Sequence, residues 1–511
     1  MVLKVNEFER ALDEYGTRAA LLDRDSNIQY VSNSLEDIFN GETLLKFIRH
    51  HHSRQKPRLQ ILQNYYEGKT VNRTMRQRRI EEDRADHRIS HPFAEYISDF
   101  TNGYFLGKPI RVNFENDNEN LKRDVNDKLN EVLQYNDMDS INRLIGLDLS
   151  VYGRAYEIVT KNDKDEYRVY RMKPEETFII YDNSIEVNSL CAVNYYPLDT
   201  VIDSETVYAV DVYTNAHIYH YEVQLDTESN LKEDDHEEEH FFGRVPITEL
   251  SNNKDRRGDF EKVISLIDLY DASQADTANY MTDLNDAMLV IAGQLNVSIE
   301  ELREMKQANI LYLEPSVSQD NSTGNERVIS NADAKYIYKQ YDASGVESYK
   351  ERLANDIHTL TNTPNMTDAH FSGNASGEAM KYKLFGLEQK TVIKEGMFLK
   401  GLRRRFKLLQ TIMQMDRYVD GNVDFKDLEY TFVRNTPKSV TEDLQAFTNA
   451  GGRLSQETLI NLFGFSEDTQ AELDRIENEQ PKTLDLYDWQ TDDKVTDDKT
   501  VNEVDDVNEE E

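Results

Sequence analysis

Apolar residues recur at helical spacing along several stretches of the first 150 residues. The clearest pattern follows Pro92 and ends at Gly107, and its members are Phe93, Tyr96, Ile97, Phe100 and Tyr104. This spacing places the side chains on one face of a helix, and proline suits the first helical turn. Weaker patterns of the same kind predict helices within 46–88, over 120–134 and over 139–149.

The period of the pattern changes between Val151 and Leu250, where short runs rich in Val, Ile and Tyr alternate with polar turns. These runs are Ala155–Val159, Tyr167–Met172, Thr177–Tyr181, Val207–Tyr213 and His217–Val223. Such runs between turns are typical of antiparallel strands. The next segment, Lys232–His240, holds six acidic residues and one lysine, and we expect it to be a solvated hairpin tip.

Helical spacing returns in two stretches that flank a mixed segment. Asp259 precedes a stripe of aliphatic residues and is expected to cap a helix over 259–284. Ser344 and Glu347 have the spacing of a capping box, which predicts a second helix over 344–362. Between the two helices we expect a strand at Ile310–Leu313 and a loop over 316–325.

The longest predicted helix follows a loop over 363–376. It starts near Ser376, which suits a cap, and runs to about Met415 along an apolar stripe that includes Leu402, Phe406, Leu409 and Met413. Gly386, Gly396 and Gly401 lie inside this helix and predict a kink. A strand over Val423–Val433 and short helices over 437–480 complete the pattern, which predicts an α+β, mainly helical fold.

The strong acidity of the chain narrows the classes of function. The formal net charge is −37, and residues 485–511 alone hold twelve acidic residues and two lysines. We expect this tail to be disordered, because it has little apolar surface to bury. A chain of this charge is poorly suited to gripping duplex DNA without specificity, since such binding gains from cations that neutralise phosphates. DNA passing nearby is not excluded.

Cysteine use and hydrophobicity indicate the compartment. Cys191 is the only cysteine, so no intrachain disulfide can form, which fits a reducing environment. The first residues carry charges where a signal peptide needs an apolar core. The longest apolar stretch, near Ala287–Ala292, is far shorter than the ~20 residues of a membrane-spanning helix. We therefore expect an intracellularly made protein without a membrane segment.

Two groups of histidines are candidate metal ligands. His50, His51 and His52 are consecutive, and consecutive helical residues point about 100° apart, so a solvated or partner-facing patch is the better interpretation. His87 and His91 have the i, i+4 spacing that can share a metal ion. Pro92, however, pushes His91 out of the helical region, so we expect no metal here.

The sequence segment that most resembles a catalytic or phosphate-binding motif does not match either motif. Gly373–Gly377 has serine in the fourth position, where a nucleophile elbow needs it third, and Glu378 stands where a phosphate loop needs lysine. Cys191 lies in a strand-like run and is expected to be packed rather than catalytic. The carboxylates are too numerous for any pair to stand out. The chain is therefore expected to be no enzyme and to need no cofactor.

Basic residues are concentrated in two stretches of this acidic chain. Residues 46–88 hold twelve Lys or Arg against five acidic residues, and 381–407 hold nine against two. Either stretch could meet nucleic acid. Contacts between neighbouring subunits are the more economical interpretation, because a chain with so much surplus acid can neutralise these cations itself.

Three segments together resemble the portal proteins of tailed bacteriophages, in the branch found in siphoviruses of Gram-positive hosts. They are 87–110, with the run HRISHPFAEYI and then YFLGKPI; 258–293, which begins GDFEKVISLIDLY; and 363–379, with TPNMTDAHFSGNASGEA before the long helix. Their order and spacing cover about 85–415, and the set rather than any single motif carries the likeness. A staphylococcal phage is the specific expectation.

The resemblance implies a subunit of a closed ring, usually of about twelve copies in the virion, at one capsid vertex. It implies a wing over 1–258 and 377–436, stem helices over 259–284 and 344–362, a clip over 285–343, a helical crown over 437–484 and the acidic tail. The loop over 363–376 would line the DNA channel through Asn365, Met366, Thr367, Asp368, Ala369, His370, Phe371, Ser372, Gly373 and Asn374. The implied partners are other copies of the chain, the terminase packaging motor, the major capsid and scaffolding proteins, the head-tail connector and double-stranded DNA.

The residues of this loop agree with such a role, because it carries Asp368 and His370 but neither lysine nor arginine. A conduit should touch DNA without holding it, and every cationic contact adds affinity that translocation must undo. Two alternatives stay open. One is another virion component, such as a minor capsid or head-tail adaptor protein, and the other is a metal-dependent nuclease that uses some of the many acids.

Overall fold

The structure is a computed structural model, and it describes most of the first 436 residues. The described ranges are 23–39, 42–74, 85–162, 164–199, 206–225, 231–283, 288–292, 316–319, 326–330, 333–337, 342–366 and 382–436, with the separate residues 21, 298, 300, 301, 303, 449, 455, 460, 473, 475 and 476. The chain divides into two units, Met1–Thr436 and Pro437–Glu511. Apart from six separate residues, the helices predicted over 437–480 lie outside the described residues, as does the whole acidic tail.

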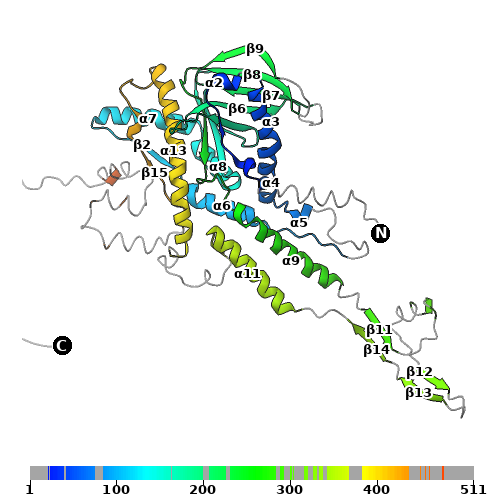
Figure 1. The fold of residues 1–511 in the computed structure, drawn as a ribbon. Coiled ribbons are helices and arrows are strands. Elements are labelled where there is room, and N and C mark those ends of the chain that lie inside the picture. Colours follow the sequence, from blue (N-terminus) through cyan, green and yellow to red (C-terminus); the bar gives the residue numbers. More distant parts are fainter. Residues whose placement is uncertain are drawn as a thin grey trace, which may run out of the picture. The chain divides into compact units, whose positions relative to one another are not determined.

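A six-stranded sheet forms one part of the first unit, in the order β1-β5-β6-β7-β8-β9 (Figure 1). Its strands are β1 (Tyr30–Val31), β5 (Thr177–Tyr181), β6 (Ser189–Pro197), β7 (Val207–Tyr213), β8 (His217–Gln224) and β9 (Lys232–Glu239). All neighbours pair antiparallel except β1, which is parallel to β5. The predicted strands of this region are therefore confirmed, and β6 contains the strand-like run around Cys191, for which no bounds were predicted.

The expectation of a hairpin tip at Lys232–His240 was wrong, because this segment is the edge strand β9. It pairs with β8, with a register shift between Tyr219 and Tyr221. Only one edge of β9 is paired in the sheet. Acidic side chains on an edge strand repel further strands, so the charge run is compatible with a strand at this position.

Short helices cover one face of the six-stranded sheet. The 3-10 turn η1 (Arg24–Asn27) is followed by α2 (Leu35–Phe39) and α3 (Thr43–His50). Ile38, Leu45 and Ile48 from these helices are buried against Phe178 and Val210 of the sheet. Cys191 belongs to the same cluster and is fully buried, which confirms that it is packed.

The histidine triplet lies where α3 passes through a single π-helical turn, η2 (His51–Gln55), into α4 (Lys56–Tyr66). The prediction of a solvated or partner-facing patch was wrong for His51, which is fully buried. Its Nδ1 lies 2.9 Å from the Tyr195 hydroxyl, and its ring stacks on Phe178. The extra residue of the π turn allows this aromatic contact because it shifts the helix face that meets the sheet.

A second, three-stranded sheet has the order β10-β3-β4. It consists of β10 (Ile247–Ser251), β3 (Arg154–Lys161) and β4 (Tyr167–Met172), and α6 (Phe93–Leu106), α7 (Glu119–Tyr135) and α8 (Met138–Tyr152) precede it in the chain. Gly153 joins α8 to β3 with a φ of 80°, and a Cβ here would lie 2.4 Å from the Arg256 carbonyl oxygen. The turn therefore requires glycine.

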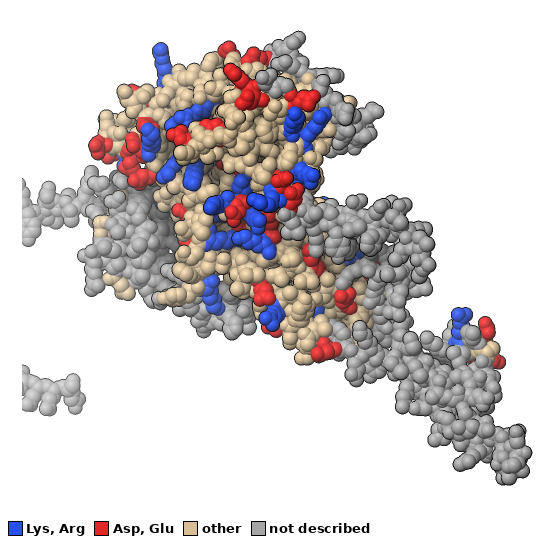
Figure 2. Space-filling model, viewed as in Figure 1, with Lys and Arg blue, Asp and Glu red and all other residues tan. Residues whose placement is uncertain are grey.

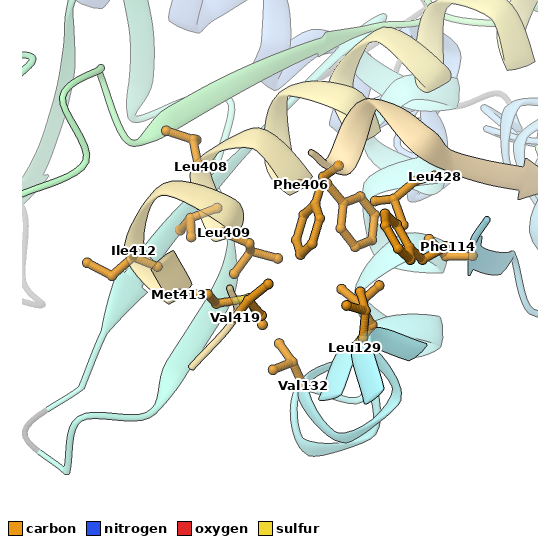
Figure 3. Close-up of a cluster of buried hydrophobic side chains, with 14 of the residues drawn as sticks. Phe114, Leu129, Val132, Phe406, Leu408, Leu409, Ile412, Met413, Val419 and Leu428 are labelled. Carbon is orange, nitrogen blue, oxygen red and sulfur yellow. The ribbon is translucent and has the colours of Figure 1, made fainter. Parts of the chain in front are cut away.

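The longest helix, α13 (Phe385–Met415), packs on the second sheet and on α7 (Figure 1). The C-terminal half of α13 shares a buried apolar cluster with α7, with β2 (Arg111–Phe114), with β15 (Leu428–Thr431) and with the 3-10 turn η5 (Phe425–Asp427). Figure 3 shows Phe406, Leu409 and Met413 pointing towards Leu129 and Val132. The predicted end at Met415 is confirmed, and the strand predicted within 423–433 is shorter than expected.

The start predicted for α13 near Ser376 lies outside the described residues. The helix is continuous from Phe385 across all three of its glycines, and the kink stays a prediction. Two of the glycines allow close contacts instead. A Cβ at Gly401 would lie 2.6 Å from the Leu250 side chain, and one at Gly386 would lie 3.0 Å from Asn362 Oδ1.

Two long helices, α9 (Ile264–Asp283) and α11 (Ala343–Thr361), lie side by side (Figure 1). A short 3-10 turn, η3 (Glu261–Val263), precedes α9, and a four-residue helix, α5 (Val71–Thr74), contacts α9. Ile357 of α11 is buried in one cluster with Ile264 and Ile267 of α9. Asp342 caps α11 by accepting a hydrogen bond from the Gly345 backbone, so the capping box predicted from Ser344 is wrong.

The segment between α9 and α11 contains two antiparallel strand pairs. β11 (Met288–Ala292) pairs with β14 (Asp333–Ile337), and β12 (Ser316–Gln319) pairs with β13 (Glu326–Ser330). The loop predicted over 316–325 is therefore wrong for its first four residues, and the strand predicted at 310–313 lies outside the described residues. The described chain is a mixture of helix and sheet, about half helical rather than mainly helical.

Candidate functional site

The candidate site is the segment where the predicted channel loop leaves α11. We call residues Thr361–Met366 the loop root. Of the ten predicted channel residues, Asn365 and Met366 are described, and Thr367–Asn374 lie outside the described residues. The Gly373–Gly377 motif lies outside them as well. The chemistry that the structure shows is therefore that of the loop root and its supports.

The end of α11 is closed by its own backbone. Asn362 adopts a left-handed conformation with a φ of 54°, and the Thr363 N–H donates to the His358 carbonyl oxygen at 3.1 Å. Asparagine tolerates this conformation better than most residues. The ring of His358 completes the turn, because its Nδ1 lies 3.1 Å from the Thr363 carbonyl oxygen. Burial lowers the pKa of His358, although this hydrogen bond opposes the change.

Lys390 of α13 binds the same helix end from another side. Its Nζ donates to the Thr361 carbonyl oxygen at 3.1 Å and lies 3.1 Å from Asp259 Oδ1. A cation at a helix C-terminus satisfies a free carbonyl and interacts favourably with the helix dipole. The loop root is thus joined to α13 and, through Asp259, to the segment before α9.

Asp259 is the centre of a buried charge cluster, and the prediction that it caps the following helix was wrong. Lys394 Nζ lies 2.8 Å from Asp259 Oδ2 and also donates to the Ser150 hydroxyl, while Asn252 donates to Oδ1. Burial alone would raise the pKa of Asp259, but Lys390 and Lys394 hold it well below its usual value. The carboxylate therefore stays charged at neutral pH and joins α13 to the chain before α9.

Tyr96 of α6 supports the far end of the loop root. Its hydroxyl donates to the Pro364 carbonyl oxygen at 2.8 Å, and the Met366 N–H donates to the same hydroxyl at 3.4 Å. Its ring meets His358 edge-on, with 5.6 Å between the centroids. The helical stripe predicted Tyr96 as a core residue, and no sequence signal indicated the contact with a segment about 270 positions away.

His87 and His91 hold the extended chain before α6 against α9. The His91 backbone N–H and Nδ1 lie 2.9 and 3.0 Å from Asp271 Oδ1, and the His87 backbone N–H donates to Asn279. Asp271 and Asn279 are fully buried on α9. No group of three or more potential ligands that could hold a metal ion is found among the described residues. The two histidines instead attach the extended backbone before α6 to α9 through their backbone N–H groups.

Four cations of the two basic stretches, Arg58, Lys390, Lys394 and Arg405, pair within their own chain, so the expectation of contacts with other subunits or DNA is wrong for these four and stays a prediction for the rest. Arg58 pairs with Glu261, and its side chain is 1% exposed. Arg405 is fully buried and forms a charged, hydrogen-bonded pair with Glu157. Lys390 binds the loop root, and both Lys390 and Lys394 pair with Asp259. Burying a charged group requires a partner, and these arginines and lysines have theirs inside the fold.

The described surface in Figure 2 carries both signs of charge in small, interspersed groups. On this face, no continuous cationic band of the kind that grips a phosphate backbone runs across the described residues. Cys191 is fully buried, and burial raises its pKa to about 12, which disfavours the thiolate that a catalytic cysteine needs. No described helix is both long and apolar enough to cross a lipid bilayer.

Comparison with known sequences shows which protein family the chain matches. The family described as "Phage portal protein, SPP1 Gp6-like" matches residues 45–484, which is most of the chain. The chain belongs to this family of phage portal proteins. Its recognition from three sequence segments is thereby confirmed, and a minor capsid or adaptor protein is not favoured.

Two portal proteins of other phages agree with the family match, and one solved structure is also similar. The portal protein of Bacillus phage SPP1 is 26% identical over 482 residues, which covers 91% of this chain and 89% of the relative. The portal protein of Clostridium phage phiCD119 is 25% identical over 415 residues, covering 78% and 86%. A chain from the solved structure "Neck of empty GTA particle computed with C6 symmetry" is 12% identical with a TM-score of 0.42, covering 74% and 90%. The function of the chain is that of a phage portal protein, a component of the virion.

Proposed function

We propose that about twelve copies of this chain form a closed ring at one capsid vertex, through which double-stranded DNA is packaged and later ejected. In this proposal the ring is a structural part without catalysis or cofactor. It serves as the docking platform for the terminase motor and the head-tail connector, and it contacts the major capsid and scaffolding proteins. The ring assembles in the host cytoplasm.

The family match over residues 45–484 is the observation that carries this proposal. The arrangement of α9 and α11 supports it. These helices pack together as a pair, and the pairing of β11 with β14 closes the segment between them. We assign 259–284 and 344–362 to the stem, 285–343 to the clip, 1–258 and 377–436 to the wing, and 437–484 to the crown.

The proposed channel loop is the part of the ring that DNA would meet. The residues 363–376 hold one acidic side chain, Asp368, and no lysine or arginine. Duplex DNA carries about one negative charge per 1.7 Å, so a cationic collar around it would act as an electrostatic brake. A loop without cations lets the duplex slide.

The substitution Asp368→Lys tests this role. In a ring of about twelve subunits it changes the charge of the collar by about 24 units, and we expect procapsids of normal composition that package DNA slowly or incompletely. Asp368→Asn is the matched control and should be much milder. Electron microscopy of the purified protein checks the ring, and DNA per capsid over time checks packaging. Asp368→Lys particles that fill at the parental rate would mean that this loop does not line the path.

A further inference from the structure

One tyrosine hydroxyl contacts the backbone on both sides of Asn365, the first predicted channel residue. Tyr96 donates to the carbonyl oxygen of Pro364 and accepts from the N–H of Met366. We propose that Tyr96 is a positioning residue for translocation: it fixes the direction in which the channel loop leaves α11. This inference rests on the proposed function, because it gives the loop its starting geometry but does not itself place the loop in the channel.

The ring of Tyr96 is held in place independently of its hydroxyl. It stacks on Phe100 one turn along α6, with 5.9 Å between centroids, and it meets His358 of α11 edge-on. Phe93, on the preceding turn of α6, contacts both His358 and Tyr270 of α9. Aromatic contacts of this kind fix ring orientation, so the hydroxyl points to one place with little loss of entropy on bonding.

The two supports of the loop root come from different elements. Lys390 binds the carbonyl of Thr361, before the turn at Asn362, and Tyr96 binds the backbone at Pro364 and Met366, after it. The chain between them is short, and Thr363 is almost fully buried. A backbone held on both sides of a turn has few directions left for its continuation. The direction of the chain at the loop root is therefore determined by α6 as well as by α11.

Helix α6 connects the loop root to the body of the subunit, that is, to α4, α8 and α9. Ala94 and Ile97 of α6 are buried with residues of α4, α8 and α9 in one apolar cluster. A change in the packing of the body would move Tyr96. Tyr96 would in turn move the loop root, because its hydroxyl forms hydrogen bonds with the backbone of Pro364 and Met366. This coupling would allow the wing to change the position of the channel loop without any change inside α11.

The substitution Tyr96→Phe isolates the hydroxyl, because phenylalanine keeps the ring and its contacts. A spin label at Ser372→Cys reports motion of the loop in the purified, full-length protein. Cys191 is fully buried with a pKa raised to about 12, so the engineered thiol is the reactive one. With two backbone hydrogen bonds removed, we expect the loop root to leave its position about tenfold more often, which narrows the label spectrum.

Tyr66→Phe is the matched control. Its hydroxyl also makes a hydrogen bond to a residue of α6, Asp99, but the group is exposed and does not touch the loop root. Both variants should assemble like the parent and have similar melting temperatures, and only Tyr96→Phe should mobilise the label and slow packaging. Unchanged label motion in Tyr96→Phe overturns the inference. A mobilised label with Asp368→Lys particles that still fill at the parental rate instead refutes the channel role of the loop.

Discussion

The two halves of α13 contain clusters of different kinds: a charge cluster around Asp259 in the N-terminal half, and a large apolar cluster in the C-terminal half, where Arg405 also pairs with Glu157. In the N-terminal half, Lys390 and Lys394 reach the buried carboxylate of Asp259. In the C-terminal half, Phe406 and Leu409 lie in the largest apolar cluster with residues of α7, β2 and β15 (Figure 3). The same helix therefore contacts the loop root through Lys390, and it contacts the body through the apolar cluster and the Arg405–Glu157 pair.

The two clusters should respond differently to substitution in the free energy of unfolding. Apolar packing loses stability in proportion to the atoms removed and the cavity left behind. A buried charge cluster behaves otherwise, because removal of one member leaves its partners buried and uncompensated. Substitution in the Asp259 cluster of the N-terminal half should therefore lower stability abruptly, and substitution in the apolar cluster of the C-terminal half should lower it gradually. The connection through Lys390 consists of a few directional polar contacts, which suits the loop root because these contacts fix the orientation of the backbone.

The largest expected effect comes from Asp259→Asn. The substitution keeps the shape of the side chain but leaves Lys390 and Lys394 beside each other without the carboxylate. We expect the free energy of unfolding to fall by about 3–5 kcal/mol, as for other broken buried ion pairs. Urea denaturation at pH 7 measures the change.

The control for this prediction is Asp124→Asn on α7, which removes an exposed pair with Lys128. An exposed pair of this i, i+4 kind should contribute only about 0.3–0.5 kcal/mol. The double variant Asp259→Asn, Lys394→Met should be less destabilised than the sum of its single changes, because it buries one fewer uncompensated charge. Similar losses in Asp259→Asn and Asp124→Asn would contradict the contrast between the two halves.

Leu409→Ala tests the apolar half and should have the next largest effect. Leu409 is 1% exposed within the cluster, so truncation leaves a cavity and should cost about 2–4 kcal/mol in the free energy of unfolding. Leu409→Met, which nearly conserves volume, should cost less than about 1.5 kcal/mol. Leu360→Ala on α11 is the matched control, since that side chain is 63% exposed and should change little. A Leu409→Met variant as unstable as Leu409→Ala would show that packing in this half is not graded.

The sequence predicted these two halves unequally. The apolar stripe through Leu402, Phe406 and Leu409 has the helical period, so both the helix and its buried face could be read from it. Lys390 and Lys394 appeared only as part of a basic stretch. A sequence shows a charge but not the distant carboxylate that balances it, and Asp259 lies more than 130 positions away.

The same reason separates the rest of the fold into predictable and unpredictable parts. Strands β4, β5 and β7 were predicted with their correct bounds because enrichment in Val, Ile and Tyr between polar turns is a local signal. β9 was missed because six acidic residues resemble a solvated turn, and only the pairing with β8 reveals a strand. At the candidate site, the resemblance supplied the loop, whereas the support by Tyr96 depends on the tertiary fold that brings α6 beside residue 364.

The last prediction has the smallest expected effect and concerns the pH dependence of stability, which depends on the buried histidine His51. The apolar side chains of Phe406 and Leu409 do not titrate, and the pKa of Asp259 lies well below neutral. Burial, together with the positive charges of Arg154 and Lys56, holds the pKa of His51 well below its usual value. The unfolded chain therefore binds a proton below pH ~6.5 that folded His51 excludes, so stability is present above that pH and is lost as the pH falls.

Between pH 7.5 and 5.5 this exclusion should cost the wild-type protein about 1 kcal/mol of the free energy of unfolding. His51→Phe keeps the stacking on Phe178 and removes the titrating group, so its stability should change less over the same interval. The comparison uses the slope against pH and not the absolute stability, because loss of the bond to Tyr195 lowers the stability of the variant at every pH. Urea denaturation of both proteins at several pH values measures the slopes. Equal slopes would mean that folded His51 takes up its proton as readily as the unfolded chain does, and that the π-helical turn does not exclude the charge.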